Sequence, residues 1–201
     1  NDTLDGGSGN DAINGGDGND VMLASAGNDT YIFGSGSDTI DYSGLNTSIS
    51  LIRGGTVNKG SLGTDTFKDF YSTIKATSST SDWIDGLTGG GKIASLNADL
   101  SAQSLKISGL PGTGNASFNV QNFENIKGSN TADRIKGDSN NNILQGNGGD
   151  DVMLASAGND TYTFGSGNDT LDYSNLGPIT LNKGGSVNKF REGRALVVAR
   201  Y

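Results

Sequence analysis

The sequence predicts an all-β fold, a right-handed parallel β-roll or β-helix in which short strands stack along one axis. Two observations support this fold class. A nine-residue unit repeats without a break through residues 6–41 and returns in residues 128–172, each time with a bulky apolar residue eighth and, in all but one unit, an aspartate sixth. Glycine is abundant, at 33 of 201 residues, while only 32% of the residues are hydrophobic. An external ligand is therefore expected to stabilise the fold.

Each nonapeptide has two halves. Glycines at the first, second and fourth positions allow positive φ angles and a tight turn, which leaves backbone carbonyls free to face a ligand. The last three residues form a short strand whose central side chain points inward. Two units make one turn of a flattened coil, so each loop lies beside the loop two units away. In residues 6–41 the sixth and eighth residues are Asp11 with Ile13, Asp20 with Met22, Asp29 with Tyr31, and Asp38 with Ile40.

Composition and charge exclude several functions. The net charge is -8, and no Lys or Arg precedes Arg53, so nucleic acid and anionic lipid are unfavourable partners. The chain has no Cys and no His, which removes the usual zinc ligands and leaves oxygen donors for hard cations. It shows no signal-peptide core and no apolar run that could span a bilayer. Because it starts within a repeat, we expect it to be an excerpt of a longer protein.

The sixth-position aspartates point to a divalent cation. Carboxylates from units two apart converge between stacked loops, and a hard cation with about six oxygen ligands removes their repulsion. The units resemble the RTX (repeats-in-toxin) calcium-binding nonapeptide, G-G-x-G-x-D-x-U-x. The alternative, a solvated Gly/Asp-rich linker, is disfavoured because linkers do not keep an apolar residue in phase with an aspartate. The resemblance implies a β-roll that binds several calcium ions.

The resemblance also implies ligands. In the family, one loop gives the carbonyls of its second and fourth residues, the facing loop gives those of its first and third, and both sixth-position aspartates complete the site. Ala24 and Phe33 replace consensus glycines but would donate through the backbone. In the first block the implied ligands are Gly7, Gly9 and Asp11 with Ala24, Ala26 and Asp29; Gly16, Gly18 and Asp20 with Phe33, Ser35 and Asp38; and Asp2 with Gly15, Asp17 and Asp20.

The second block repeats the first 131 residues later, and VMLASAGNDTY occurs verbatim at Val21 and Val152. Its sixth residues are Asp133, Asn142, Asp151, Asp160 and Asp169. Asn142 supplies no charge, so its site is expected to fill last or not at all. The implied ligands are Ser129, Thr131 and Asp133 with Gly146, Gly148 and Asp151; Asn147, Gly149 and Asp151 with Phe164, Ser166 and Asp169; and Asp138, Asn140 and Asn142 with Ala155, Ala157 and Asp160.

The chain is expected to divide into five parts. These are a first calcium block (1–42), a calcium-poor β segment (43–127), a second block (128–173), the start of a further copy (174–189) and an atypical tail (190–201). The tail is interpreted as an appended, non-native sequence, with a closing strand as the alternative.

Within the calcium-poor segment, alternation predicts strands in 48–52, 104–107 and 117–120, and 93–105 is the one candidate for a helix. Isolated units at 60–68 and 78–85, with Asp65 and Asp82 in the sixth place, are interpreted as turns of the coil rather than calcium sites. Neither has a partner two units away. Whether 43–127 continues the coil or forms a separate β-domain stays open.

The sequence predicts no catalysis in this segment. It lacks His, Cys and nucleophile or phosphate motifs, and its close carboxylates are assigned to calcium. We therefore expect a calcium-stabilised structural segment of a secreted or surface protein, such as an adhesin, that folds on meeting extracellular calcium. The resemblance to RTX proteins implies export through type I secretion. The alternative is a carbohydrate-binding accessory module of an RTX-containing enzyme, similar to those of alginate epimerases. There Trp83 would stack on an extracellular polysaccharide. No membrane insertion is expected.

Overall fold

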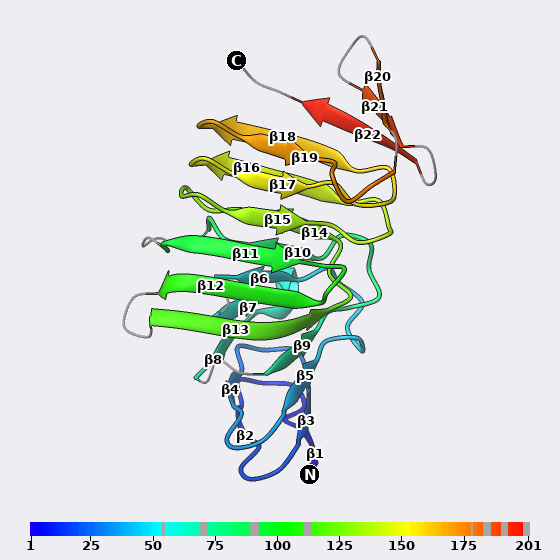
Figure 1. Cartoon of the computed structure of the whole chain (residues 1–201). Coiled ribbons are helices and arrows are strands. Elements are labelled where there is room, and N and C mark those ends of the chain that lie inside the picture. The colour runs from blue at the N-terminus through cyan, green and yellow to red at the C-terminus, as the bar shows by residue number, and fades with distance from the viewer. Residues whose placement is uncertain are drawn as a thin grey trace.

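The computed structural model describes residues 1–53, 55–68, 72–88, 93–110, 114–177, 179–182, 186–189 and 193–198, the last three ranges by their backbone alone. Two sheets face each other along one long axis, with the N-terminus at the narrow end of the stack (Figure 1). In the described residues the only helical element is a single 3-10 turn, Gly60–Leu62. The predicted all-β class is confirmed.

The first sheet has ten strands, which are described here in spatial order. They are β1 (Thr3–Asp5), β3 (Val21–Leu23), β5 (Thr39–Asp41), β9 (Thr73–Lys75), β13 (Gly114–Gln121), β12 (Ser104–Leu110), β11 (Ser95–Asp99), β15 (Arg134–Lys136), β17 (Val152–Leu154) and β19 (Thr170–Asp172).

The second sheet has twelve strands. In spatial order they are β2 (Ala12–Asn14), β4 (Thr30–Ile32), β8 (Thr64–Phe67), β7 (Thr56–Asn58), β6 (Ser50–Ile52), β10 (Trp83–Asp85), β14 (Asn125–Lys127), β16 (Ile143–Gly148), β18 (Thr161–Ser166), β22 (Gly193–Val198), β21 (Ser186–Lys189) and β20 (Ile179–Asn182).

Strand register confirms the coil with two units per turn. In the first sheet Leu4 pairs with Met22 and Met22 with Ile40, and in the second Ile13 pairs with Tyr31, all in parallel strands. Successive strands along the chain therefore alternate between the sheets, and loops of units two apart lie side by side. The fold is the parallel β-roll that the nonapeptide pattern predicted.

Residues 43–127 continue the same two sheets, which answers the question that the sequence left open. Each sheet takes in one antiparallel triplet: β6, β7 and β8 in the second sheet, and β11, β12 and β13 in the first. Parallel pairing resumes on both sides of each triplet, for example between β4 and β8 and between β11 and β15. The strands predicted within 48–52, 104–107 and 117–120 are present, and the helix considered at 93–105 is wrong, since β11 occupies it.

The core lies between the two sheets and includes the eighth-position side chain of most units, together with other buried residues such as Tyr42, Leu51 and Leu96. The eighth-position side chains are buried because the central residue of a three-residue strand points inward. An added aromatic contact joins Phe33 to Phe67, whose ring centroids are 5.7 Å apart. The buried eighth-position residues are Ile13, Met22, Tyr31, Ile40, Phe67, Ile74, Ile84, Ile126, Ile135, Leu144, Met153 and Tyr162.

At the far end of the stack, the backbone of β22 pairs in parallel with β18 and antiparallel with β21. This is the place that β8 takes beside β4 and β7 in the first copy. The tail predicted to be non-native thus contributes a strand through residues 193–198. Its remaining residues, 190–192 and 199–201, lie outside the described residues, as do 178 and 183–185 of the further copy.

Candidate metal centre

A ladder of hydrogen bonds joins the loops of units that are one coil turn apart. The backbone N–H of Asp11 donates to Oδ1 of Asp29 at 3.0 Å, and that of Asp20 donates to Oδ1 of Asp38 at 2.9 Å. In each such pair, one carboxylate oxygen of the later aspartate holds the preceding loop. The same bond joins Asp2 to Asp20, Asp29 to Asp65, Asp133 to Asp151, Asn142 to Asp160, and Asp151 to Asp169.

The surroundings of the second carboxylate oxygen, Oδ2, divide these aspartates into two groups. The Oδ2 atoms of Asp11, Asp20 and Asp151 are buried and have no hydrogen-bond partner among the described residues. A buried carboxylate oxygen without a donor is strongly unfavourable unless a cation faces it. These three atoms are the positions at which the structure fits a metal ion.

In the other group the chain supplies donors to Oδ2. Ser156 Oγ and the Tyr162 hydroxyl both donate to Asp160 Oδ2 at 3.0 Å. The Ser129 hydroxyl lies 3.0 Å from both carboxylate oxygens of Asp133, and the Ser129 N–H also donates to Oδ2. Both of these aspartates have a serine at the second position of their own unit, where the first group has Gly7, Gly16 and Asn147.

Backbone carbonyls lie near two of the unpartnered oxygens, those of Asp20 and Asp151. A Cβ placed on Gly15 would lie 2.6 Å from the Phe33 carbonyl oxygen and 2.9 Å from Asp20 Oδ2. In the second block a Cβ on Gly146 would lie 2.5 Å from the Phe164 carbonyl oxygen and would also collide with Asp151 Oδ2. Each block thus has a small cradle of carboxylate and carbonyl oxygen beside a first-position glycine. Oxygen donors of this kind suit Ca²⁺.

The glycines have two separate functions, and the sequence interpretation was wrong on one of them. Positive φ occurs at the second and fourth positions, for example 77° at Gly7, 132° at Gly9 and 75° at Asn147. First-position glycines such as Gly6 and Gly15 do not have positive φ. They are needed because a side chain there would collide with the sixth-position carboxylate.

Third-position carbonyls have a partner already. The N–H of Gly9 donates to the Ala26 carbonyl at 3.0 Å, and that of Gly18 donates to the Ser35 carbonyl at 2.8 Å. Gly149 makes the equivalent bond to Ser166 at 2.9 Å. These carbonyls keep a second lone pair for a metal. The structure thus places the carbonyls of Ala26, Ser35 and Ser166 beside their facing loops.

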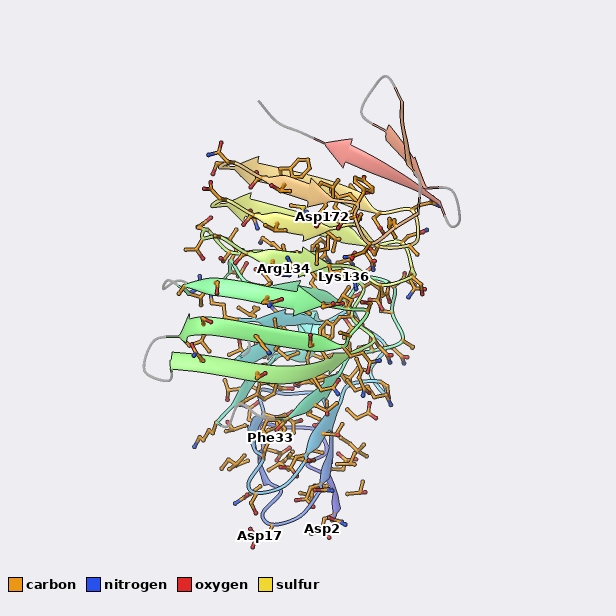
Figure 2. The ribbon with its side chains drawn as sticks, in the orientation of Figure 1. Asp2, Asp17, Phe33, Arg134, Lys136 and Asp172 are labelled. Atoms are coloured by element: carbon orange, nitrogen blue, oxygen red, sulfur yellow. The ribbon has the colours of Figure 1, made fainter. Side chains whose placement is uncertain are left out.

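The remaining implied ligands lie at the ends of the stack or in the neutral site. Asp2 and Asp17 lie at the N-terminal end (Figure 2), where the Ser35 hydroxyl donates to Asp17 Oδ1 at 2.6 Å. Asn142 is fully engaged, because its Nδ2 donates to the Glu124 carbonyl at 2.7 Å and its Oδ1 accepts from the Asp138 N–H at 3.0 Å. Both polar atoms of the Asn142 side chain therefore already have hydrogen-bond partners within the chain.

Fifth-position residues also join the loops, and sequence reasoning missed them. The Asn28 N–H donates to Asn10 Oδ1 at 2.8 Å, and the Asn168 N–H donates to Asp150 Oδ1 at 2.8 Å. These bonds run in the opposite direction from the aspartate ladder, so each pair of loops is held reciprocally. The signal was visible in the sequence as the recurring Asn-Asp dipeptide.

Glu124 was also missed. It stands two residues before the core residue Ile126, in the phase of a sixth-position acid, and its Oε2 accepts the Asp82 N–H at 2.9 Å. Burial, with the nearby charges of Asp82 and Asp138, raises the pKa of Glu124 to about 7. The ladder therefore extends into the calcium-poor segment through a glutamate.

Burial has a similar effect in the second block. It raises the pKa of Asp151 to about 7, and the charges of Asp133 and Asp169 add to the shift. A cation beside these carboxylates would lower the free energy of their ionised forms. No group of three or more His, Cys, Asp or Glu side chains gathers in the described residues, so any metal here relies on paired carboxylates and backbone carbonyls.

The described residues contain no helix of membrane-spanning length and hydropathy.

A family model described as the RTX calcium-binding nonapeptide repeat matches the chain in four copies, over residues 5–40, 127–162 and 136–171. No curated protein matches the chain. The matched residues are the two blocks that carry the carboxylate and carbonyl cradles. The nonapeptides of both blocks therefore match the RTX calcium-binding repeat, a structural calcium-binding motif.

Proposed function

We propose that the chain is a calcium-gated structural segment of a secreted or surface-attached protein. It stays loose where calcium is scarce and closes into a rigid β-roll at extracellular calcium concentrations. The observation that carries the proposal is the pair of buried, unpartnered oxygens, Asp20 Oδ2 and Asp151 Oδ2, each beside the carbonyl of a phenylalanine.

The physical reason is the free energy of buried charge. Without a cation, ionised carboxylates stacked one coil turn apart repel each other and lose their hydration on folding. A bound Ca²⁺ reverses both effects, so its binding free energy becomes folding free energy. Sites of the extracellular class fill at about 10⁻⁴ to 10⁻³ M calcium. A protein of this kind would pass through a secretion channel unfolded and fold outside the cell.

The proposed ligands are the first-block and second-block residues named from the sequence. Sites with an unpartnered oxygen, those of Asp11, Asp20 and Asp151, are expected to fill first. The site of Asn142 and Asp160 is expected to fill last or not at all, because Asn142 is neutral and Asp160 Oδ2 already accepts two hydroxyl donors.

Circular dichroism during a calcium titration tests the proposal. We expect β-signal to rise between micromolar and millimolar calcium and to fall again with a chelator, while magnesium at equal concentration gives little change. A double variant, Asp20→Asn with Asp151→Asn, should need far more calcium for the same signal. β-signal of the wild type that does not respond to calcium or chelator would refute the function.

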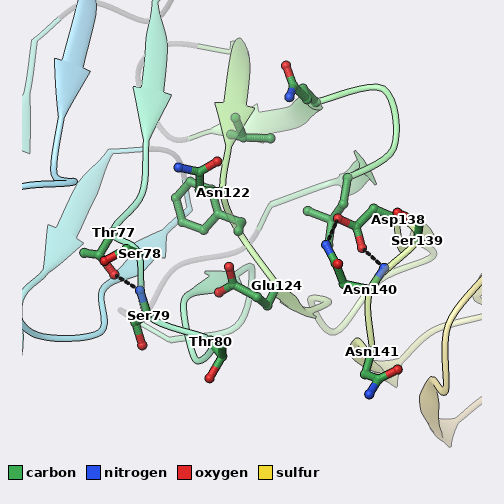
Figure 3. A pocket seen from close by; sticks show the side chains of 14 residues that line it. Thr77, Ser78, Ser79, Thr80, Asn122, Glu124, Asp138, Ser139, Asn140 and Asn141 are labelled. Atoms are coloured by element: carbon green, nitrogen blue, oxygen red, sulfur yellow. Dashed lines mark hydrogen bonds between the residues drawn. The ribbon is translucent and has the colours of Figure 1, made fainter.

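A polar cleft supports a second candidate, carbohydrate binding. Its volume is about 750 Å³, and Figure 3 shows the side chains of Thr77, Asn122, Glu124 and Asn140 along it. Trp83 does not line it; the indole is half-buried in β10, so a stacking role for Trp83 is not favoured. A glycan array with and without calcium tests this function. Specific binding that Thr80→Trp abolishes would support it, and no binding would leave the structural function alone.

A further inference from the structure

Lys59 is a completely buried lysine outside both calcium blocks. Its ammonium contacts three oxygen atoms: the Ser25 carbonyl at 2.7 Å, Asp29 Oδ2 at 3.3 Å and Asp65 Oδ1 at 2.5 Å. The relative exposure of all three charged side chains is 0%. Each of the three ammonium protons therefore has an acceptor, and the charge is shared between two carboxylates.

The segment around Asp65 stacks on the third nonapeptide just as the nonapeptides stack on each other. The Asp29 N–H donates to Asp65 Oδ1 at 3.1 Å, and Tyr31 pairs with Phe67 in parallel strands. The Gly27 N–H donates to the Leu62 carbonyl at 2.8 Å, as Gly9 does to its own facing loop. Residues 24–32 and 60–68 thus form one more stacked pair of loops, although 36 residues separate the paired positions rather than 18.

The oxygens that Lys59 contacts are those of a loop site. In this stack, Ser25 is a second-position residue, and Asp29 and Asp65 are the two sixth-position residues. The other carboxylate oxygens are satisfied by the chain as well: the Tyr42 hydroxyl donates to Asp65 Oδ2 at 2.9 Å, and the Asp11 N–H donates to Asp29 Oδ1 at 3.0 Å. Neither aspartate has an unpartnered oxygen, in contrast to Asp20 and Asp151.

We propose that Lys59 is a built-in cation, whose ammonium occupies the place that a calcium ion would take between residues 24–32 and 60–68. The junction between the first block and the calcium-poor segment therefore closes without calcium and binds none. The inference rests on the proposed function, because it assumes that the neighbouring loops do bind calcium. Calcium then controls the folding of the two blocks, whereas the junction stays closed with or without calcium.

The antiparallel triplet explains why a lysine can reach this place. β7 runs antiparallel to both β6 and β8, and residue 59 follows β7 directly, where its ammonium contacts the Ser25 carbonyl of the facing loop. Two other lysines of the calcium-poor segment also form ion pairs with aspartates of a neighbouring turn. Lys75 pairs with Asp41 at 2.8 Å and Lys127 with Asp85 at 3.3 Å, each across one turn of the coil.

Calcium stoichiometry of Lys59→Met tests the inference. Met keeps the length of the side chain and removes the charge, so two buried carboxylates are left to attract a metal. Isothermal titration with calcium chloride should give one more ion per chain than the wild type. In chelator the melting temperature of the variant should fall below that of the wild type, and calcium should restore it. Lys75→Met is the matched control, which should bind the same number of ions as the wild type.

A second variant keeps the test decisive if Lys59→Met folds poorly in chelator. Lys59→Met with Asp65→Asn removes one carboxylate as well, and in calcium it should return to the wild-type stoichiometry. If Lys59→Met gains no ion while the wild type binds several, Lys59 is an ordinary buried ion pair and the inference fails. If the wild type itself binds no calcium, the proposed function fails instead.

Discussion

The backbone N–H of Asp133 donates to Oδ1 of Asp151 at 2.9 Å, across one turn of the coil. Asp151 in turn donates its own N–H to Oδ1 of Asp169 at 3.0 Å, while its Oδ2 is buried and unpartnered among the described residues. One aspartate therefore belongs to two consecutive loop pairs. The ladder couples neighbouring sites along the stack.

Shared ligands predict unequal losses of calcium. Asp151→Asn removes a carboxylate from two sites, whereas Asp169→Asn removes one from a single site. We expect isothermal titration to show about two ions lost for the first variant and about one for the second, relative to the wild type. Asn keeps an oxygen for the ladder, so the loops still stack. Equal losses would contradict the sharing of Asp151.

Gly146 is predicted to be required beside Asp151 because no side chain fits there. In Gly146→Ala the new methyl group would collide with the Phe164 carbonyl and Asp151 Oδ2, although the backbone angles themselves permit alanine. Crowding of this kind should destabilise the calcium-bound protein by about 1–3 kcal/mol. Urea unfolding in millimolar calcium measures it. Gly44→Ala is the control, because its Cβ would meet nothing within 4 Å.

Asp82 should stabilise the fold without calcium. Its carboxylate is buried and accepts the Ile49 N–H at 2.7 Å and, from Thr77, the N–H at 3.0 Å and the hydroxyl at 2.7 Å. Asp82→Ala leaves these donors unsatisfied, with an expected loss of roughly 2–4 kcal/mol. The loss should be the same in chelator and in calcium. The exposed Asp5→Ala should change stability by less than about 0.5 kcal/mol.

Glu124 predicts a pH dependence. The native state holds this proton up to a pKa of about 7, whereas an unfolded glutamic acid ordinarily loses it near 4.5. Between these two pKa values the native state binds more protons than the unfolded state. The contribution of Glu124 to stability therefore falls as the pH rises and is fully lost above pH 7. Glu124→Gln stays neutral and can still accept the Asp82 N–H. Melting temperatures measured from pH 5 to 8 in calcium should fall less for the variant; parallel curves would exclude Glu124 as the source.

Hydrogen exchange should locate the calcium response. In chelator, the amides of β6, β10 and β14 are expected to stay protected, because the ion pairs of Lys59 and Lys127 and the bonds of Asp82 hold these turns. Amides of the ladder at Asp11, Asp133 and Asp151 should exchange quickly until calcium is added. Uniform protection, or uniform loss of it, would contradict a response confined to the two blocks.

Much of the fold could be predicted because the nonapeptide is local. An apolar residue in every eighth place requires a strand with its centre buried, and Met22, Tyr31 and Met153 are buried as predicted. Two units per turn follow from the spacing, which the 18-residue ladder confirms. The sequence also placed residues 60–68 and 78–85 as turns of the coil, and their core residues Phe67 and Ile84 lie between the sheets.

The repeated unit is encoded within nine residues, which set its core residue, its turn and the phase of its aspartates. The tertiary structure decided which loops face each other once the antiparallel triplets break the spacing, so that Asp65 meets Asp29 and Glu124 meets Asp82. Whether a carboxylate has a donor is partly local, because Ser129 and Ser156 reach Asp133 and Asp160 from four residues away in their own units. Only the stacking of the chain brings Lys59 to Asp29.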